Sequence, residues 1–172
     1  MRKFKNLSNQ EQVKLREQFI DLEKKLAQKD ISEYTYLAIS VFDHWLTREE
    51  FDSHLFNTSV EEQKLRNKAL YSFSKNVVES TRVVNFKLCG LKSKQKPLFR
   101  SFTSEKAKLD YFLPVIGSSG KSFFLSVLPD LNVIFIESWD DTNIMYLKDK
   151  SVKPLIEKWA AESGVYCLDK WT

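Results

Sequence analysis

The chain has 172 residues, of which 42% are hydrophobic and 13% aromatic, and it contains only four glycines and four prolines. This length and composition exclude a disordered tail and predict one domain, residues 1–172, with few long linkers. The formal net charge of +4 is small, which disfavours a protein dedicated to binding nucleic acid.

The N-terminus, the apolar runs and the cysteines indicate the compartment. Met1-Arg2-Lys3-Phe4-Lys5 is basic, but no apolar segment follows as it does in a secretory signal. The apolar runs are far shorter than a membrane span. Cys89 and Cys167 have no CxxC spacing, which predicts free thiols and neither a zinc site nor a disulfide framework. We therefore expect a cytoplasmic protein that does not contact a membrane.

Capping signals predict that the first half of the chain, about residues 8–80, is helical. Ser8 and Glu11 have the spacing of a capping box, as do Thr47 and Glu50. Apolar residues at helical spacing follow each start signal. The predicted helices are Ser8–Lys29, Thr47–Phe56 and Ser59–Ser80.

The stretch Asp30–Leu46 fits two structures. Tyr34, Leu37, Val41 and Trp45 share one face of a helix, but the same stretch is rich in residues that favour strands. We favour a helix because no Gly or Pro interrupts it.

From about residue 82 to 170 the pattern changes to strands. Alternation in Arg82–Leu88 and a returning run in Leu98–Phe102 predict a hairpin. Three apolar runs separated by turns predict an antiparallel meander, and Gly164 suits the position after a helix. The elements expected after the hairpin are a short helix in Thr103–Leu113, the strands Ser122–Leu128, Asn132–Ser138 and Asn143–Leu147, a helix Val152–Ser163 capped by Ser151, and a last strand Val165–Leu168. The predicted class is α+β, with a mainly antiparallel sheet and a packed helix in the second half.

The run Gly117-Ser118-Ser119-Gly120-Lys121-Ser122 only partly matches a phosphate-binding loop. That loop needs a Gly five residues before the second Gly, and position 115 is Val115. The run also leads into a predicted strand, whereas a helix N-terminus would hold the phosphate. We expect no nucleotide cofactor.

His44 and His54 are the only histidines, and each lies near an acid, Asp43 and Asp52. On one continuous helix they would be about 15 Å apart, too far to share a metal, although a break at Thr47 could bring them together. Neither cysteine lies in the local signature of a nucleophile, and no serine does either. We therefore expect no metal, no cofactor and no enzymatic activity.

Two surfaces are candidates for binding. The predicted hairpin combines basic residues with aromatic neighbours, which is typical of proteins that bind single-stranded RNA; the basic residues are Lys87, Lys92, Lys94, Lys96 and Arg100. The turn Glu137-Ser138-Trp139-Asp140-Asp141 places a Trp among carboxylates. Such a turn suits the anchor of a protein interface, with Glu137, Trp139, Asp140 and Asp141 as partner-binding residues.

The last third of the chain resembles the C-terminal half of small bacterial immunity proteins, which neutralise toxins of contact-dependent growth inhibition and related systems. The resemblance rests on Phe123–Pro129, Val133–Asp141, Asn143–Leu147 and Gly164–Leu168. It implies a non-enzymatic cytoplasmic inhibitor that binds one cognate toxin domain. The basic chain departs from the acidic character common among inhibitors of nuclease toxins. The resemblance therefore implies either a toxin with an acidic or mixed surface or binding through a local acidic patch such as Glu137–Asp141. A nucleic-acid-binding module that uses the hairpin around residues 87–100 is the alternative.

Overall fold

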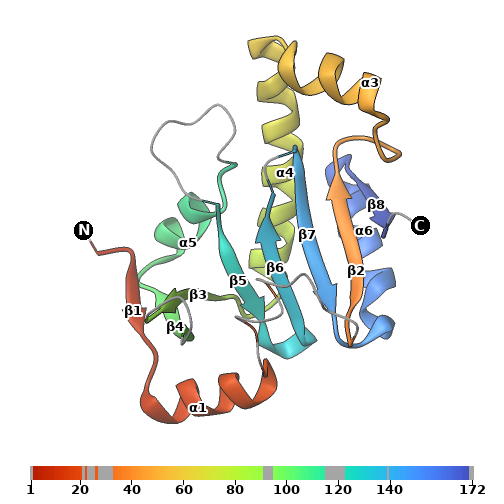
Figure 1. The fold of residues 1–172 in the computed structure, drawn as a ribbon. Coiled ribbons are helices and arrows are strands. Elements are labelled where there is room, and N and C mark those ends of the chain that lie inside the picture. Colours follow the sequence, from red (N-terminus) through yellow and green to blue (C-terminus); the bar gives the residue numbers. More distant parts are fainter. Residues whose placement is uncertain are drawn as a thin grey trace.

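The computed structural model describes residues 2–20, 22, 26, 33–90, 95–114, 123–138 and 140–170. One antiparallel sheet of eight strands runs through the molecule, with helices on both of its faces (Figure 1). The strands are β1 (Phe4–Asn6), β2 (Thr35–Ser40), β3 (Val84–Cys89), β4 (Lys96–Phe102), β5 (Leu125–Leu128), β6 (Val133–Glu137), β7 (Thr142–Leu147) and β8 (Tyr166–Asp169). Their order in the sheet is β1-β4-β3-β5-β6-β7-β2-β8.

The helices cap and cover this sheet. They are α1 (Asn9–Gln18), α3 (Arg48–Phe51) continued by a π-helical turn η1 (Asp52–Phe56), α4 (Val60–Ser80), α5 (Glu105–Tyr111) and α6 (Lys153–Ser163), with short 3₁₀ turns η3 (Pro129–Leu131) and η4 (Lys150–Val152). In Figure 1, α4 and α6 lie behind the sheet and α1 lies below its lower end. Among the described residues, no helix is long and apolar enough to cross a membrane.

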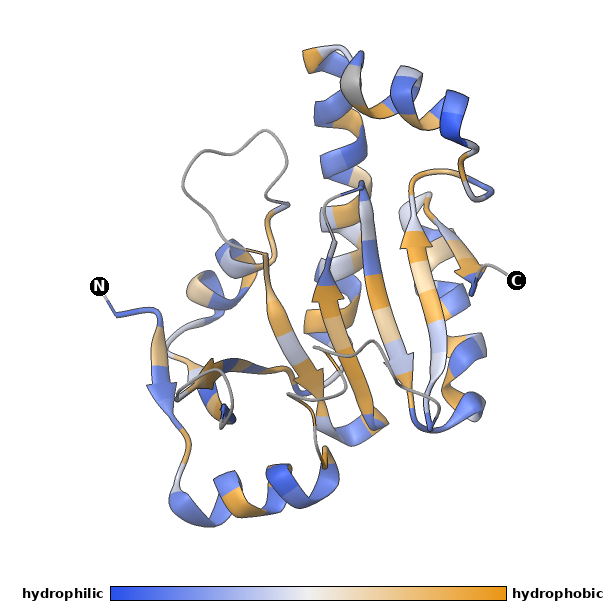
Figure 2. Cartoon of the chain, viewed as in Figure 1, coloured by the Kyte–Doolittle hydropathy of each residue, from blue (hydrophilic) through white to orange (hydrophobic). Residues whose placement is uncertain are grey.

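Alternation along the strands builds a core on each side of the sheet. In β6, Val133 and Phe135 face the cluster that contains Phe73 and Val77 of α4, whereas Ile134 faces the cluster formed with α1. Figure 2 shows apolar colour concentrated on the central strands and mostly polar colour on α1 and α3.

The sheet divides where β3 meets β5. Only Val84 and Asn85 pair with β5, at Val127 and Ser126. Beyond them, side chains replace the missing ladder: the Asn85 amide donates to the Leu125 carbonyl at 3.0 Å, and the Leu125 N–H donates to the Tyr111 hydroxyl at 2.8 Å. These bonds satisfy buried polar groups that strand pairing leaves free.

Several predictions from the sequence are confirmed. The hairpin β3–β4, the helices α4 and α5, and the meander β5–β6–β7 form where the patterns placed them. Ser8, Thr47 and Ser59 are N-caps, and Thr47 with Glu50 completes a capping box. Gly164 ends α6 with a φ of 71°.

Other predictions are wrong. The first half is not uniformly helical, because β1 and β2 lie within it. The stretch favoured as a helix over Asp30–Leu46 contains β2, which is paired with β7 on one side and β8 on the other. A strand at this position is apolar on both faces and loses the alternation that identifies it. Ser151 does not cap α6, which begins after η4. Of the helix predicted over Ser8–Lys29, α1 ends at Gln18 with Phe19 as its C-cap, and Leu22 and Leu26 are again helical. The other residues from 21 to 29 lie outside the described part of the chain.

Candidate functional site

The structure separates the members of the predicted acidic turn. The carboxylates of Glu137 and Asp141 are buried, and the Glu137 carboxylate accepts from the Phe124 N–H at 3.3 Å. Only Asp140 is half-buried and reaches a cavity; Trp139 lies outside the described residues. Glu137 and Asp141 therefore do not form the exposed anchor that the sequence suggested, and a contact between Asp140 and a partner stays a prediction.

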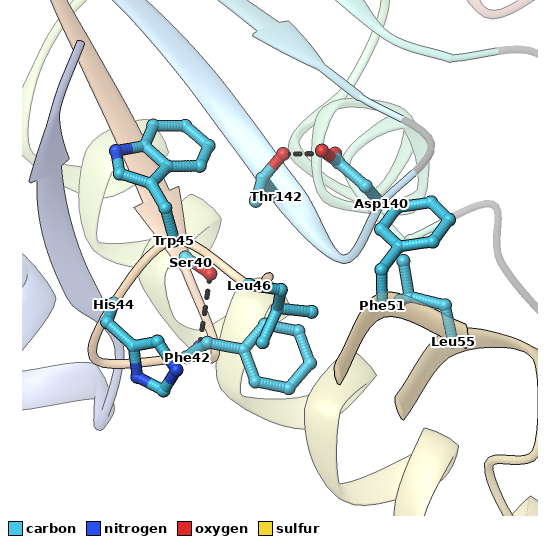
Figure 3. A pocket seen from close by; sticks show the side chains of 9 residues that line it. All are labelled: Ser40, Phe42, His44, Trp45, Leu46, Phe51, Leu55, Asp140 and Thr142. Carbon is cyan, nitrogen blue, oxygen red and sulfur yellow. Dashed lines mark hydrogen bonds between the residues drawn. The ribbon is translucent and has the colours of Figure 1, made fainter. Parts of the chain in front are cut away.

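A cavity that the sequence did not predict lies beside this turn. We call it the aromatic pocket (Figure 3). Its volume is about 200 Å³, and it is lined by Ser40, Phe42, His44, Trp45, Leu46, Phe51, Leu55, Asp140 and Thr142. The walls come from the end of β2, the loop that follows it, α3 with η1, and the start of β7. Most of this lining is apolar, with Asp140 and Thr142 at one side in Figure 3.

Local interactions fix the walls of the aromatic pocket. The Trp45 indole N–H donates to the Asp169 carbonyl of β8 at 2.7 Å, and its ring lies 6.2 Å from that of Tyr36. The Thr142 hydroxyl donates to the Asp140 carboxylate. Burial, followed by the charges of Tyr146 and Asp140, raises the pKa of Tyr36 to about 12. Tyr36 therefore stays a neutral hydrogen-bonding group at physiological pH.

Asp140 is the acid in the lining of the aromatic pocket, and two further acids contact its lining residue His44. The two ring nitrogens of His44 lie 2.6 Å from the Asp43 carboxylate and 3.3 Å from the Glu50 carboxylate. These contacts, the first with Asp43, raise the pKa of His44 above its ordinary value. With His44 protonated, these three residues still carry one net negative charge. Asp140 adds another.

A half-exposed apolar row crosses the sheet below the aromatic pocket. Cross-strand pairing aligns Leu125 of β5 with Ile136 of β6, Ile144 of β7, Ala38 of β2 and Leu168 of β8. Tyr166 of β8 pairs with Ser40 at the adjoining position and is 49% exposed. We call the half-exposed or exposed members, Leu125, Ile136, Ile144, Leu168 and Tyr166, the open sheet face.

The open sheet face lies beyond the helix that covers the rest of this side. The next row along the same strands, which includes Ile134 and Tyr146, is buried in the cluster with Leu15 and Phe19. In Figure 1, α1 lies below the lower ends of β5 and β6. Ala38, the β2 member of the row, is fully buried, so the exposed apolar atoms lie on β5, β6 and β7 on one side of it and on β8 on the other. Apolar residues left half-exposed next to a pocket are typical of a binding surface.

The two histidines, His44 and His54, do not lie in an arrangement that suits catalysis or metal binding. Each ring nitrogen of His44 contacts a carboxylate, and these contacts favour the protonated imidazolium. An imidazolium cannot accept a proton, so it cannot act as a general base. His54 lies 5.6 Å from the Phe42 ring, centroid to centroid. Within the described part of the chain, no group of three His, Cys, Asp or Glu side chains could hold a metal. The run Gly117–Ser122 lies outside the described residues.

The basic hairpin has its aromatic residues turned inward. Phe86 and Phe99 are buried against α1, where they cannot stack on bases. The Arg100 guanidinium lies 4.1 Å from the Phe4 ring centroid and donates to Asn85. Lys87 and Lys96 are exposed, whereas Lys92 and Lys94 lie outside the described residues.

Comparisons with protein-family models, with curated proteins and with solved structures give no match to this chain. The candidate site therefore rests on its own geometry. The sequence did carry one overlooked signal: Phe42, Trp45 and Phe51 alternate with the acids Asp43 and Glu50. Such a mixture is unusual for a solvated loop.

Proposed function

We propose that this protein is a non-enzymatic inhibitor that binds another protein, as an immunity protein that neutralises a bacterial toxin domain by direct complex formation. The observation that carries the proposal is the open sheet face, which continues into the aromatic pocket. Protein interfaces bury aromatic anchors inside a polar rim. Tyr166 and Trp45 are suited to be such anchors, and Asp43, Glu50 and Asp140 to be part of such a rim.

The choice of an immunity protein within this class is supported by the resemblance of the last third of the chain. The segments that carry it include most of β5, β6, β7 and β8, the four strands that supply the members of the open sheet face. The acidic rim favours a basic partner, because complementary charge steers association and rejects wrong partners. Nucleic acid is less well supported, since Phe86 and Phe99 are buried.

The test is capture of a partner from nuclease-treated lysate of the native host, followed by a growth assay. Native protein is compared with Tyr166→Lys, and with Leu65→Lys as the matched control. Leu65 is also exposed and apolar, but it lies on α4, behind the sheet. We expect capture that survives a high-salt wash, is lost with Tyr166→Lys and persists with Leu65→Lys.

The captured protein is then expressed alone and together with this chain. We expect it to arrest growth alone and to be harmless in the presence of this chain. A captured protein without toxicity would overturn the immunity role. Retention of nucleic acid in an untreated low-salt control, without any protein partner, would favour the alternative function.

A further inference from the structure

We infer that the aromatic pocket receives one cationic side chain, an arginine or a lysine, of the partner protein. The inference rests on the proposed function for the source of the cation, but its site and chemistry come from the pocket alone. Three features of the aromatic pocket carry it: its size, the rings in its wall and the Asp140 carboxylate in its lining.

The size of the aromatic pocket suits a single side chain. Pockets for drug-sized ligands and cofactors measure about 300–1,000 Å³, whereas this one measures about 200 Å³. It adjoins the open sheet face, because its lining residue Ser40 pairs with Tyr166 of β8 on one side and with Thr142 of β7 on the other. A partner seated on the open sheet face could therefore insert one residue into it.

The rings and charges favour a cation as the occupant. Phe42, Trp45 and Phe51 supply aromatic surface, and cations are attracted to the faces of such rings. The Phe42 ring already has the Arg66 guanidinium 4.9 Å from its centroid. Arg66 does not make the region basic, since Glu62 and Asp141 both pair with it. Asp140 lines the pocket and, among the hydrogen bonds of the described residues, accepts only from Thr142. It is therefore placed to pair with a partner's cation.

The isolated protein tests this inference with small probes. Nα-acetyl-arginine amide is titrated into labelled protein, and the Trp45 indole N–H resonance is followed by NMR. The neutral isostere Nα-acetyl-citrulline amide and the apolar Nα-acetyl-leucine amide are the comparison probes. We expect a saturable shift with the arginine probe that weakens with salt, and little shift with the other two.

Two variants test whether the arginine probe binds beside Asp140 in the aromatic pocket. Asp140→Asn keeps the volume of the side chain and an acceptor for the Thr142 hydroxyl. It should weaken binding of the arginine probe about twofold to fivefold, which corresponds to the loss of one exposed ion pair. Glu162→Gln, an exposed acid on α6, should have no effect. Equal binding of the leucine or citrulline probe, or no shift with any probe, would overturn the inference.

The outcome is independent of the partner assay. If the arginine probe causes no shift but partner capture depends on Tyr166, the cation site is excluded and the protein-binding function is still supported. A probe shift in a protein that captures no toxin removes the proposed function and, with it, the assignment of the cation to a partner.

Discussion

The Arg66 guanidinium of α4 lies 3.2 Å from the Asp141 carboxylate, and both side chains are buried, with 8% and 1% exposure. Asp141 sits in the turn between β6 and β7 with a φ of 54°, and its second oxygen accepts from Gln63 at 2.7 Å. Arg66 also donates to the His54 carbonyl at 2.8 Å. One residue of α4 thus ties together the turn that carries Asp140 and the helical segment that forms the other wall of the aromatic pocket.

Removal of the Arg66 cation from this ion pair should destabilise the folded protein. Arg66→Met leaves the Asp141 carboxylate buried without its charge partner, so we expect the free energy of unfolding to fall by about 3–5 kcal/mol. Urea denaturation measures the change. Glu62→Gln is the control: it removes the exposed helical partner of Arg66 and should cost only about 0.5 kcal/mol. Equal effects of the two variants would show that Asp141 does not depend on Arg66.

The end of α6 gives a second prediction. Gly164 has a φ of 71°, and a Cβ placed there would meet no atom within 4 Å. The cost of Gly164→Ala is therefore one of backbone conformation alone, about 1–2 kcal/mol. Gly164→Asn should cost less, because Asn tolerates left-handed backbone better than Ala. Thermal unfolding of both variants checks the order, and an Asn variant less stable than the Ala variant would contradict it.

The His44 contacts predict a dependence on pH. Hydrogen bonds with Asp43 and then Glu50 raise the pKa of His44 above its unfolded value of about 6.5. The contacts therefore favour the folded chain fully below about pH 6.5, and this contribution is lost as the pH rises through the raised pKa. NMR titration of the His44 ring should give a midpoint above 6.5. Asp43→Asn should lower the midpoint, and an unchanged midpoint would contradict the assignment.

Cys167 of β8 should be a poorly reactive thiol. Burial, the largest cause, and the nearby Glu157 raise its pKa to about 11. In a Cys89→Ser background, alkylation by iodoacetamide near pH 8 should be roughly a hundredfold slower in the folded chain than in urea, because the thiolate is the reacting form. Similar rates in the two states would show that Cys167 is not protected.

Patterns within single segments were reliable guides to this fold. The caps at Ser8, Thr47 and Ser59, the alternation in β3 and the left-handed Gly164 each depend on neighbours along the chain. The interpretation of Asp30–Leu46 as a helix was wrong because its structure depends on distant parts of the chain. Strand β2 is held by pairs with β7 and β8, more than a hundred residues away, and such pairing overrides local preference. The edge strand β1, which pairs with β4, has only three residues and too short a pattern to identify.

The candidate site also combines features that local sequence patterns reveal with features that depend on contacts between distant segments. The acidic turn after β6 and the mixture of aromatic and acidic residues near Thr47 can both be identified without the structure. The sequence also determined the α+β class, through the periods of its apolar residues. Three features depend on the tertiary structure: Asp141 turns inward to Arg66, Asp140 meets Phe51 and Trp45 around one cavity, and four strands, β5 to β8, place half-exposed apolar residues on one face. Burial and pairing between distant segments depend on which surfaces meet in space, and local periodicity does not record that.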